Sequence, residues 1–73
     1  MKIEELKINP KDKELLKELA NPKTIAECAA ILGTSYNYTS TKLKVWEAMR
    51  LVKKMPKLGK EVKYFLNQDE VEL

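Results

Sequence analysis

The 73-residue sequence predicts a mainly α-helical fold, a three-helix bundle followed by a two-stranded β-hairpin. Three segments between residues 9 and 49 each start with a helix-capping residue and carry apolar residues at helical spacing. From residue 51 onward, two short strand-like runs flank a turn that contains Gly59. The length suits one domain, which we place over residues 1–73 with flanking segments 1–8 and 67–73.

The first helix is expected to begin at Pro10. Asn9 is a good N-cap, and a proline in the first turn gives up an N–H that has no partner there in any case. Asn21 and Pro22 end the helix. Its apolar stripe consists of Leu15, Leu16, Leu19 and Ala20.

The second helix starts at a capping box. In Thr24-Ile25-Ala26-Glu27 the Thr hydroxyl and the Glu carboxylate each satisfy a backbone donor of the first turn. Gly33 suits the left-handed residue that ends a helix. Cys28 belongs to the apolar face, so we interpret it as a small core residue. That face consists of Ile25, Cys28, Ala29 and Leu32.

The third helix is expected from Tyr36 to about Met49, with Ser35 as its cap. At 100° per residue, one face is centred on Leu43 and includes Trp46, and we place both in the core. Tyr36 fits either the core or the surface. The inward face consists of Tyr36, Thr39, Ser40, Leu43, Trp46 and Glu47. The outward face consists of Asn37, Tyr38, Thr41, Lys44, Val45 and Ala48, with Lys42 at its edge.

The hairpin is expected to pair residues 51–55 with residues 61–66. Alternating Val62, Tyr64 and Leu66 indicate a strand with one buried face. Pro56 cannot donate to a sheet, so it belongs at an exposed edge or at the start of the tip. The basic side chains that this places at or near the tip are Lys54, Lys57 and Lys60.

The two flanking segments give weaker signals. Residues 1–8 fit a helix by the spacing of Ile3 and Leu6, or a strand by the spacing of Leu6 and Ile8. The tail, residues 67–73, is acidic; we expect it to fray, or its Val71 and Leu73 to pack on a partner.

Charge is unevenly distributed. Residues 42–63 contain eight basic and two acidic residues, a net charge of +6, whereas the remainder has a net charge of −3. A concentrated positive segment on a nearly neutral chain favours phosphate binding. With a single cysteine and no recognisable signal sequence or membrane span, we expect a soluble cytoplasmic protein.

The sequence contains few residues of the kinds that catalysis requires. The chain has no His, one Cys expected in the core, and only two Gly, so it lacks a His/Cys metal site and the Gly-rich loops that hold phosphates. We therefore expect neither catalysis nor a cofactor.

Residues 24–52, TIAECAAILGTSYNYTSTKLKVWEAMRLV, resemble the helix-turn-helix of archaeal and bacterial winged-helix transcriptional regulators of the broad ArsR and MarR type. With the hairpin, the resemblance covers about residues 10–66. Two positions depart from the pattern. Arg50 stands where such regulators usually have Gly, so the end of the third helix is expected to differ, and Thr39 replaces a common aliphatic residue. The shared features are Ala29, Gly33, Ser35, the pair Leu43 and Trp46, and Leu51-Val52.

The resemblance implies binding to double-stranded DNA, with the third helix in the major groove and the hairpin along the backbone. Asn37 is then expected to pair with adenine, Lys42 to reach guanine, and Thr41 to meet a base edge or a thymine methyl. Tyr36 and Tyr38 are expected at phosphate, sugar or methyl groups. Phosphate contacts are expected from Ser35, Ser40 and Lys44, and backbone or minor-groove contacts from Lys54, Lys57 and Lys60.

Two alternatives to DNA stay open. The outward tyrosines and Val45 also suit a winged-helix protein-interaction module or assembly subunit, although such a module has no need of the hairpin lysines. Single-stranded RNA usually requires an aromatic-rich sheet surface, which the sequence does not provide. With no long helix after the hairpin, a homodimer would have to use the ends of the domain or a helix face.

Overall fold

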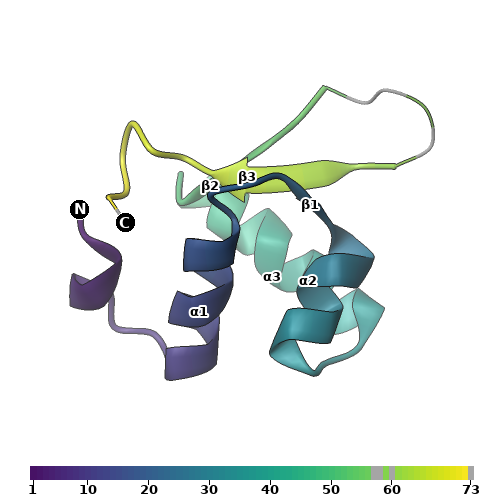
Figure 1. Cartoon of the computed structure of the whole chain (residues 1–73), viewed down its shortest axis with the longest axis horizontal. Helices are drawn as coiled ribbons and strands as arrows, with labels where there is room; N and C mark the ends of the chain where they lie inside the picture. The colour runs from purple at the N-terminus through teal and green to yellow at the C-terminus, as the bar shows by residue number, and fades with distance from the viewer. Residues whose placement is uncertain (57–58, 60, 73) are drawn as a thin grey trace.

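A computed structural model describes residues 1–56, 59 and 61–72. Three helices lie on one side of a small sheet: α1 (Pro10–Glu18), α2 (Ile25–Leu32) and α3 (Tyr36–Ala48). Figure 1 shows the sheet above them and the hairpin extending away from the bundle. Among the described residues, no helix is long and apolar enough to cross a membrane.

The helices begin where the sequence predicts. The Asn9 side chain accepts the Asp12 N–H at 2.9 Å, and the Ser35 hydroxyl accepts the Tyr38 N–H at 3.1 Å. The capping box of α2 is formed in both directions between Thr24 and Glu27. Backbone hydrogen bonding at the Glu27 carboxylate lowers the pKa of that group. Local capping chemistry thus sets the register of all three helices.

The sheet has three antiparallel strands, one more than the predicted hairpin. The strands β2 (Val52–Lys54) and β3 (Lys63–Leu66) form the hairpin, with Val52 opposite Leu66. The added strand β1 (Lys23–Thr24) pairs with the other edge of β3, so the order is β1-β3-β2. Lys23 and the α2 cap Thr24 therefore cover an edge of β3 that would otherwise be open.

The core lies between the helices and the inner face of the sheet. The predicted alternation in β3 is correct, because Tyr64 and Leu66 are buried. Cys28 is also buried, and burial raises the pKa of its thiol to about 11, which keeps it protonated and unreactive at neutral pH. The buried apolar residues are Ile3, Leu15, Leu16, Leu19, Cys28, Leu32, Leu43, Trp46, Leu51, Val52, Tyr64, Leu66 and Val71.

Arg50 adopts a left-handed conformation, with φ of 63°. The Arg50 N–H donates to Glu47 and the Leu51 N–H donates to Trp46, the paired bonds of a Schellman helix end. The Asn67 side chain also donates to the Arg50 carbonyl, at 3.0 Å. The expected difference at this helix end is thus wrong for the backbone, which takes the geometry usually given to Gly despite the cost to a residue with a Cβ.

The two flanking segments pair with each other. Within residues 1–8, whose type the sequence leaves open, Ile3–Glu5 form a 3-10 helix, η1. Lys2 forms a parallel bridge with Glu72, and the Met1 ammonium donates to the Glu70 carbonyl at 3.0 Å. Ile3 and Val71 are both buried. The expectation that the tail frays is therefore wrong over residues 70–72; Leu73 lies outside the described residues.

Candidate nucleic-acid interface

One face of α3 is fixed against the bundle. Leu43 and Trp46 are buried, as predicted. Thr39 is also fully buried, and its hydroxyl bonds to the Ser35 carbonyl at 2.9 Å and the Thr34 hydroxyl at 2.8 Å. These bonds satisfy the polar group where an aliphatic residue is common, so the substitution leaves no unpaired buried atom. The inward face holds the opposite face of α3 in a defined orientation.

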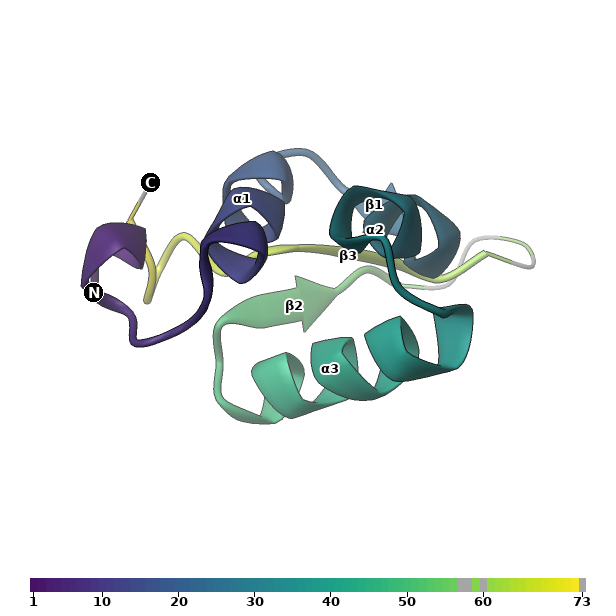
Figure 2. The same cartoon turned by 90° about the horizontal axis from the view of Figure 1, so that it is seen from below.

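The opposite face of α3 is open to solvent and mixes apolar with polar groups. Tyr38 is 54% exposed and Val45 is 51% exposed, and Met49 follows at the helix end with 58% exposed. Asn37, Thr41, Lys44 and Ala48 are exposed between them. Figure 2 shows α3 along one side of the molecule, beside β2, with no other element covering its outer side. This face thus presents both apolar and polar groups to solvent.

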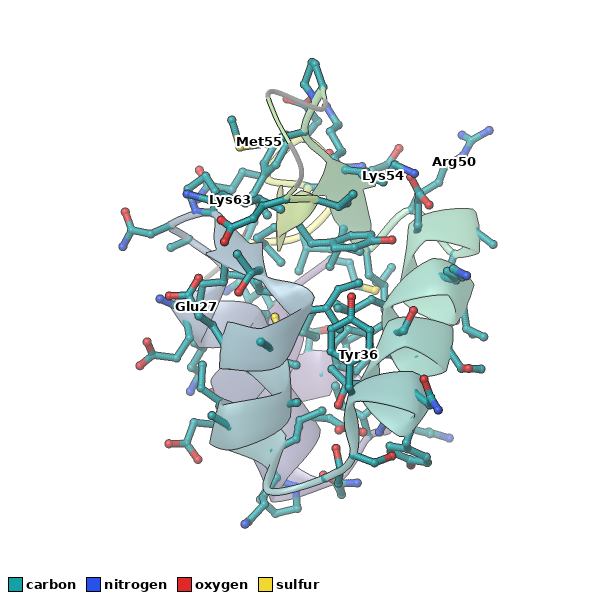
Figure 3. All side chains as sticks on the ribbon, turned by 90° about the vertical axis from the view of Figure 1, so that its right-hand side faces the viewer. Glu27, Tyr36, Arg50, Lys54, Met55 and Lys63 are labelled. Carbon is teal, nitrogen blue, oxygen red and sulfur yellow. The ribbon has the colours of Figure 1, made fainter. Side chains whose placement is uncertain are left out.

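Tyr36 belongs to the surface, which settles the choice that the sequence left open. It is 56% exposed and lies at the start of α3, facing the space between α2 and α3 in Figure 3. Its neighbours form a shallow depression of about 240 Å³. Residues lining it are Thr24, Ile25, Ala26, Tyr36, Glu61 and Val62.

Lys42 lies where the sequence did not place it. Its ammonium is 2.7 and 2.8 Å from the two carboxylate oxygens of Asp12, on α1. The side chains are only 16% and 9% exposed, respectively. The ammonium also lies 5.2 Å from the centre of the Tyr38 ring and 5.6 Å from that of Trp46. The expectation that Lys42 is free to reach guanine therefore does not fit its position.

Electrostatics at Lys42 favour its charged form. Burial opposes that form, but the hydrogen bonds and charge of Asp12 outweigh burial and raise the pKa of Lys42 above its usual 10.5. The positive charge is thus retained and neutralised within the fold. It joins α3 to α1 and adds little to the field that a phosphate would meet.

Other predicted residues of α3 are available at its surface. Lys44 is exposed on the side of the helix away from Asp12. Ser35 is exposed, and its hydroxyl accepts the capping bond while retaining its own proton for a further acceptor. Ser40 is half-buried. The Thr41 hydroxyl donates to the Asn37 carbonyl at 3.1 Å.

The hairpin divides its lysines between two faces. Lys54 lies opposite the buried Tyr64, and Figure 3 shows it on the α3 side of the sheet, as it shows Arg50. Lys53 points to the other face and is paired with Asp69 at 2.9 Å. Lys63 is exposed and lies toward α2 in Figure 3. The predicted tip residues Lys57 and Lys60 lie outside the described residues.

Sequence reasoning missed Arg50 and Lys63 as candidate contacts. Both lie in the positive segment 42–63, so charge density alone marked the region. Arg50 stands out in the sequence only as a departure at a helix end, and the alternation in β3 turns Lys63 outward without marking it as a contact. Among the described residues, no group of three His, Cys, Asp or Glu side chains is arranged to hold a metal ion.

The order of helices and strands, with α2 and α3 joined by a tight turn and followed by the hairpin, defines a winged helix-turn-helix fold. A solved winged helix-turn-helix DNA-binding domain from Mycobacterium bovis has a similar structure, with a TM-score of 0.72. That domain is homodimeric and is described as part of a possible ArsR-family transcriptional regulator.

The similarity is one of fold. Sequence identity is 19%, and the match covers 85% of this chain and 57% of the M. bovis chain. This chain thus spans a little over half of the solved one. No protein-family model and no curated protein sequence matches it.

Proposed function

We propose that this chain binds double-stranded DNA as a transcriptional regulator, with α3 in the major groove and the hairpin along the backbone. The observation that carries the proposal is the open face of α3, which presents Asn37 and Thr41 with Lys44 beside them. Lys54 lies on the same side of the sheet. The fold that this chain shares with a DNA-binding domain supports the same arrangement.

The proposed contacts fall into two groups. Asn37 and Thr41 meet base edges, since an amide pairs well with adenine and a threonine suits either a base edge or a thymine methyl. The second group meets sugar and phosphate groups, and such contacts position the protein without reading sequence. It consists of Ser35, Tyr36, Tyr38, Ser40 and Lys44. Lys54 and the tip lysines Lys57 and Lys60 continue along the backbone or minor groove. Lys42 is left out because Asp12 holds its ammonium.

Fluorescence anisotropy of a labelled mixed-sequence duplex, titrated with protein at several salt concentrations, tests DNA binding. We expect the binding constant to fall steeply with salt, because each phosphate contact releases counterions. No binding even at low salt would overturn the proposal.

The hairpin supplies a matched pair of variants for the same assay. Lys54→Ala removes an exposed ammonium on the α3 side of the sheet, whereas Lys53→Ala removes one that Asp69 already neutralises on the other face. We expect Lys54→Ala to weaken binding to every duplex and lower the salt slope by roughly 0.9. Lys53→Ala should leave both the affinity and the salt slope nearly unchanged. Equal effects of the two changes would contradict the proposed placement of the hairpin.

A protein-interaction function is the second candidate. Tyr36, Tyr38, Val45 and Met49 are each more than half exposed, and large apolar side chains of this kind are typical of protein interfaces. If the chain fails to bind any duplex, loss of partner binding on Tyr38→Ala, with the fold intact by circular dichroism, would support this candidate.

We propose a homodimer on DNA as a further part of this function, since the solved domain from M. bovis is homodimeric. Two copies related by a two-fold axis predict two half-sites about one helical turn apart. Analytical ultracentrifugation with and without DNA measures the stoichiometry. A single copy per duplex at saturation would exclude the dimer.

A further inference from the structure

The open face of α3 carries a row of side chains that end in methyl groups. Thr41, Val45 and Ala48 lie at positions i, i+4 and i+7, which places them one above the other on a helix. All three are exposed. Between the N-terminal Asn37 and the end of α3, the centre of this face is therefore apolar.

Thr41 contributes its methyl group more than its hydroxyl. The hydroxyl donates its proton to the Asn37 carbonyl at 3.1 Å, so that proton is already used within the helix. Val45 is 51% exposed. A shallow depression of about 230 Å³ runs beside the two, lined by Tyr38, Thr41, Lys42, Val45 and Trp46. The row thus borders a shallow recess.

None of the three side chains in the row is charged. Lys42, which lines the recess beside the row, is bound to both oxygens of Asp12. Guanine presents two acceptors in the major groove, and an Arg or Lys usually reads them, whereas thymine presents a methyl group that apolar side chains contact. Lys44 flanks the row and, with Lys54, suits the phosphates on either side. Lys44 and Lys54 thus lie beside the row, and the row itself is available for apolar contact.

We propose that α3 selects A·T-rich duplex DNA by contacting the 5-methyl groups of thymines with Thr41 and Val45. Asn37 then pairs with an adenine at the start of the helix. The proposal rests on the DNA binding inferred above. It assigns the preference to methyl groups in the major groove.

Replacing thymine by deoxyuridine isolates this contact, because uracil keeps the base pair and lacks only the methyl group. Anisotropy compares three labelled duplexes of equal length at one salt concentration: alternating dA·dT, the same sequence with deoxyuridine, and alternating dG·dC. We expect dA·dT to bind tightest. Each buried methyl group is worth about fourfold in affinity, so loss of two contacts should weaken binding by roughly fifteenfold.

Variants separate direct contact from DNA shape. Val45→Ala and Thr41→Ser each remove methyl groups from the row, and Ser keeps a hydroxyl for the Asn37 carbonyl. Together they should bring the ratio of dA·dT to deoxyuridine affinity close to one. Met49→Ala is the matched control, because it removes exposed apolar surface at the end of α3 outside the row and should leave the ratio unchanged. Circular dichroism verifies that each variant is folded.

The outcomes are distinct. Tighter binding of dA·dT than of the deoxyuridine duplex, abolished in the double variant and kept in Met49→Ala, supports the proposal. Equal, salt-dependent binding of the two duplexes overturns it and leaves the proposed DNA binding standing. A difference that persists in the double variant also overturns it, since the preference then arises from duplex shape. No binding to any duplex overturns both proposals.

Discussion

Two lysines on α3, two positions apart, lie in opposite environments. Lys42 lies against Asp12, with both side chains largely out of contact with water, while Lys44 is exposed on the far side of the helix. The first links two helices, and the second is available to a ligand. Whether a lysine in the basic segment is free to meet a ligand thus depends on whether the fold brings an acidic partner from elsewhere in the chain to it.

Removing Asp12, the partner of Lys42, should have the largest effect, and this effect is on stability. Asp12→Ala leaves the Lys42 ammonium without its acceptors at a position where water reaches it poorly. Exposed pairs contribute about 0–1 kcal/mol, and breaking a fully buried pair costs about 3–5 kcal/mol. We therefore expect the free energy of unfolding to fall by about 2 kcal/mol, measured by urea denaturation.

Glu14→Ala is the control for that measurement. Glu14 is an exposed acid on the same helix, and its loss should change stability by less than about 0.5 kcal/mol. If Asp12→Ala cost no more than Glu14→Ala, the pair would be a surface contact of no structural weight.

Substitutions of Lys44 and Lys42 should have different effects on the salt dependence of DNA binding. Lys44→Ala removes a proposed phosphate contact, so the slope of log K against log salt should decrease by roughly 0.9 with little change in stability. Lys42→Met keeps most of the side-chain volume but removes a charge that Asp12 already neutralises, so the slope should stay the same while stability falls. A decrease in slope for Lys42→Met, measured where the variant is fully folded, would mean that Lys42 leaves Asp12 to contact DNA.

A smaller effect is expected in the stability of the wild type and of Lys42→Arg in alkaline solution. Because the folded pKa of Lys42 is raised above 10.5, its contribution to stability is complete below that pH and is lost as pH rises through the folded pKa. Lys42→Arg can keep a pair with both Asp12 oxygens, and its guanidinium stays charged throughout this range. The wild type should thus lose stability more steeply above pH 10.5 than Lys42→Arg.

Cys28 and Tyr64 do not disturb this comparison. Burial raises the pKa of both groups, so both also make the fold less stable at high pH. They are identical in the two proteins, and their contribution cancels in the difference. Parallel pH profiles for the wild type and Lys42→Arg would contradict the assigned role of the ion pair.

Features set by near neighbours in sequence were predictable. Asn9, Thr24 with Glu27, and Ser35 cap the helices because a capping side chain acts within three residues of its own position. The alternation in β3 and the fit of Gly33 to a left-handed helix end are likewise local. These signals, with the order of elements, were sufficient for the fold.

Features that depend on distant partners were not predictable. The strand β1 has two residues, too few for a periodic pattern, and exists because β3 offers an open edge. Lys42 has the angular position of an edge residue, and only the packing of α1 against the bundle brings Asp12, 30 residues away, within reach. At Arg50, the Asn67 side chain bonds to a helix end where sequence alone favours Gly.

The pairing of residues 1–3 with residues 70–72 closes almost the whole chain into a loop. Closing a loop of this length costs more chain entropy than any helix or the hairpin, so these contacts are expected to form late in folding and to open first. Amide hydrogen exchange at Ile3 and Glu72 would follow that opening separately from the unfolding of α3. We therefore expect the end of the molecule where the termini meet to open locally while the opposite end, where α3 begins, remains folded.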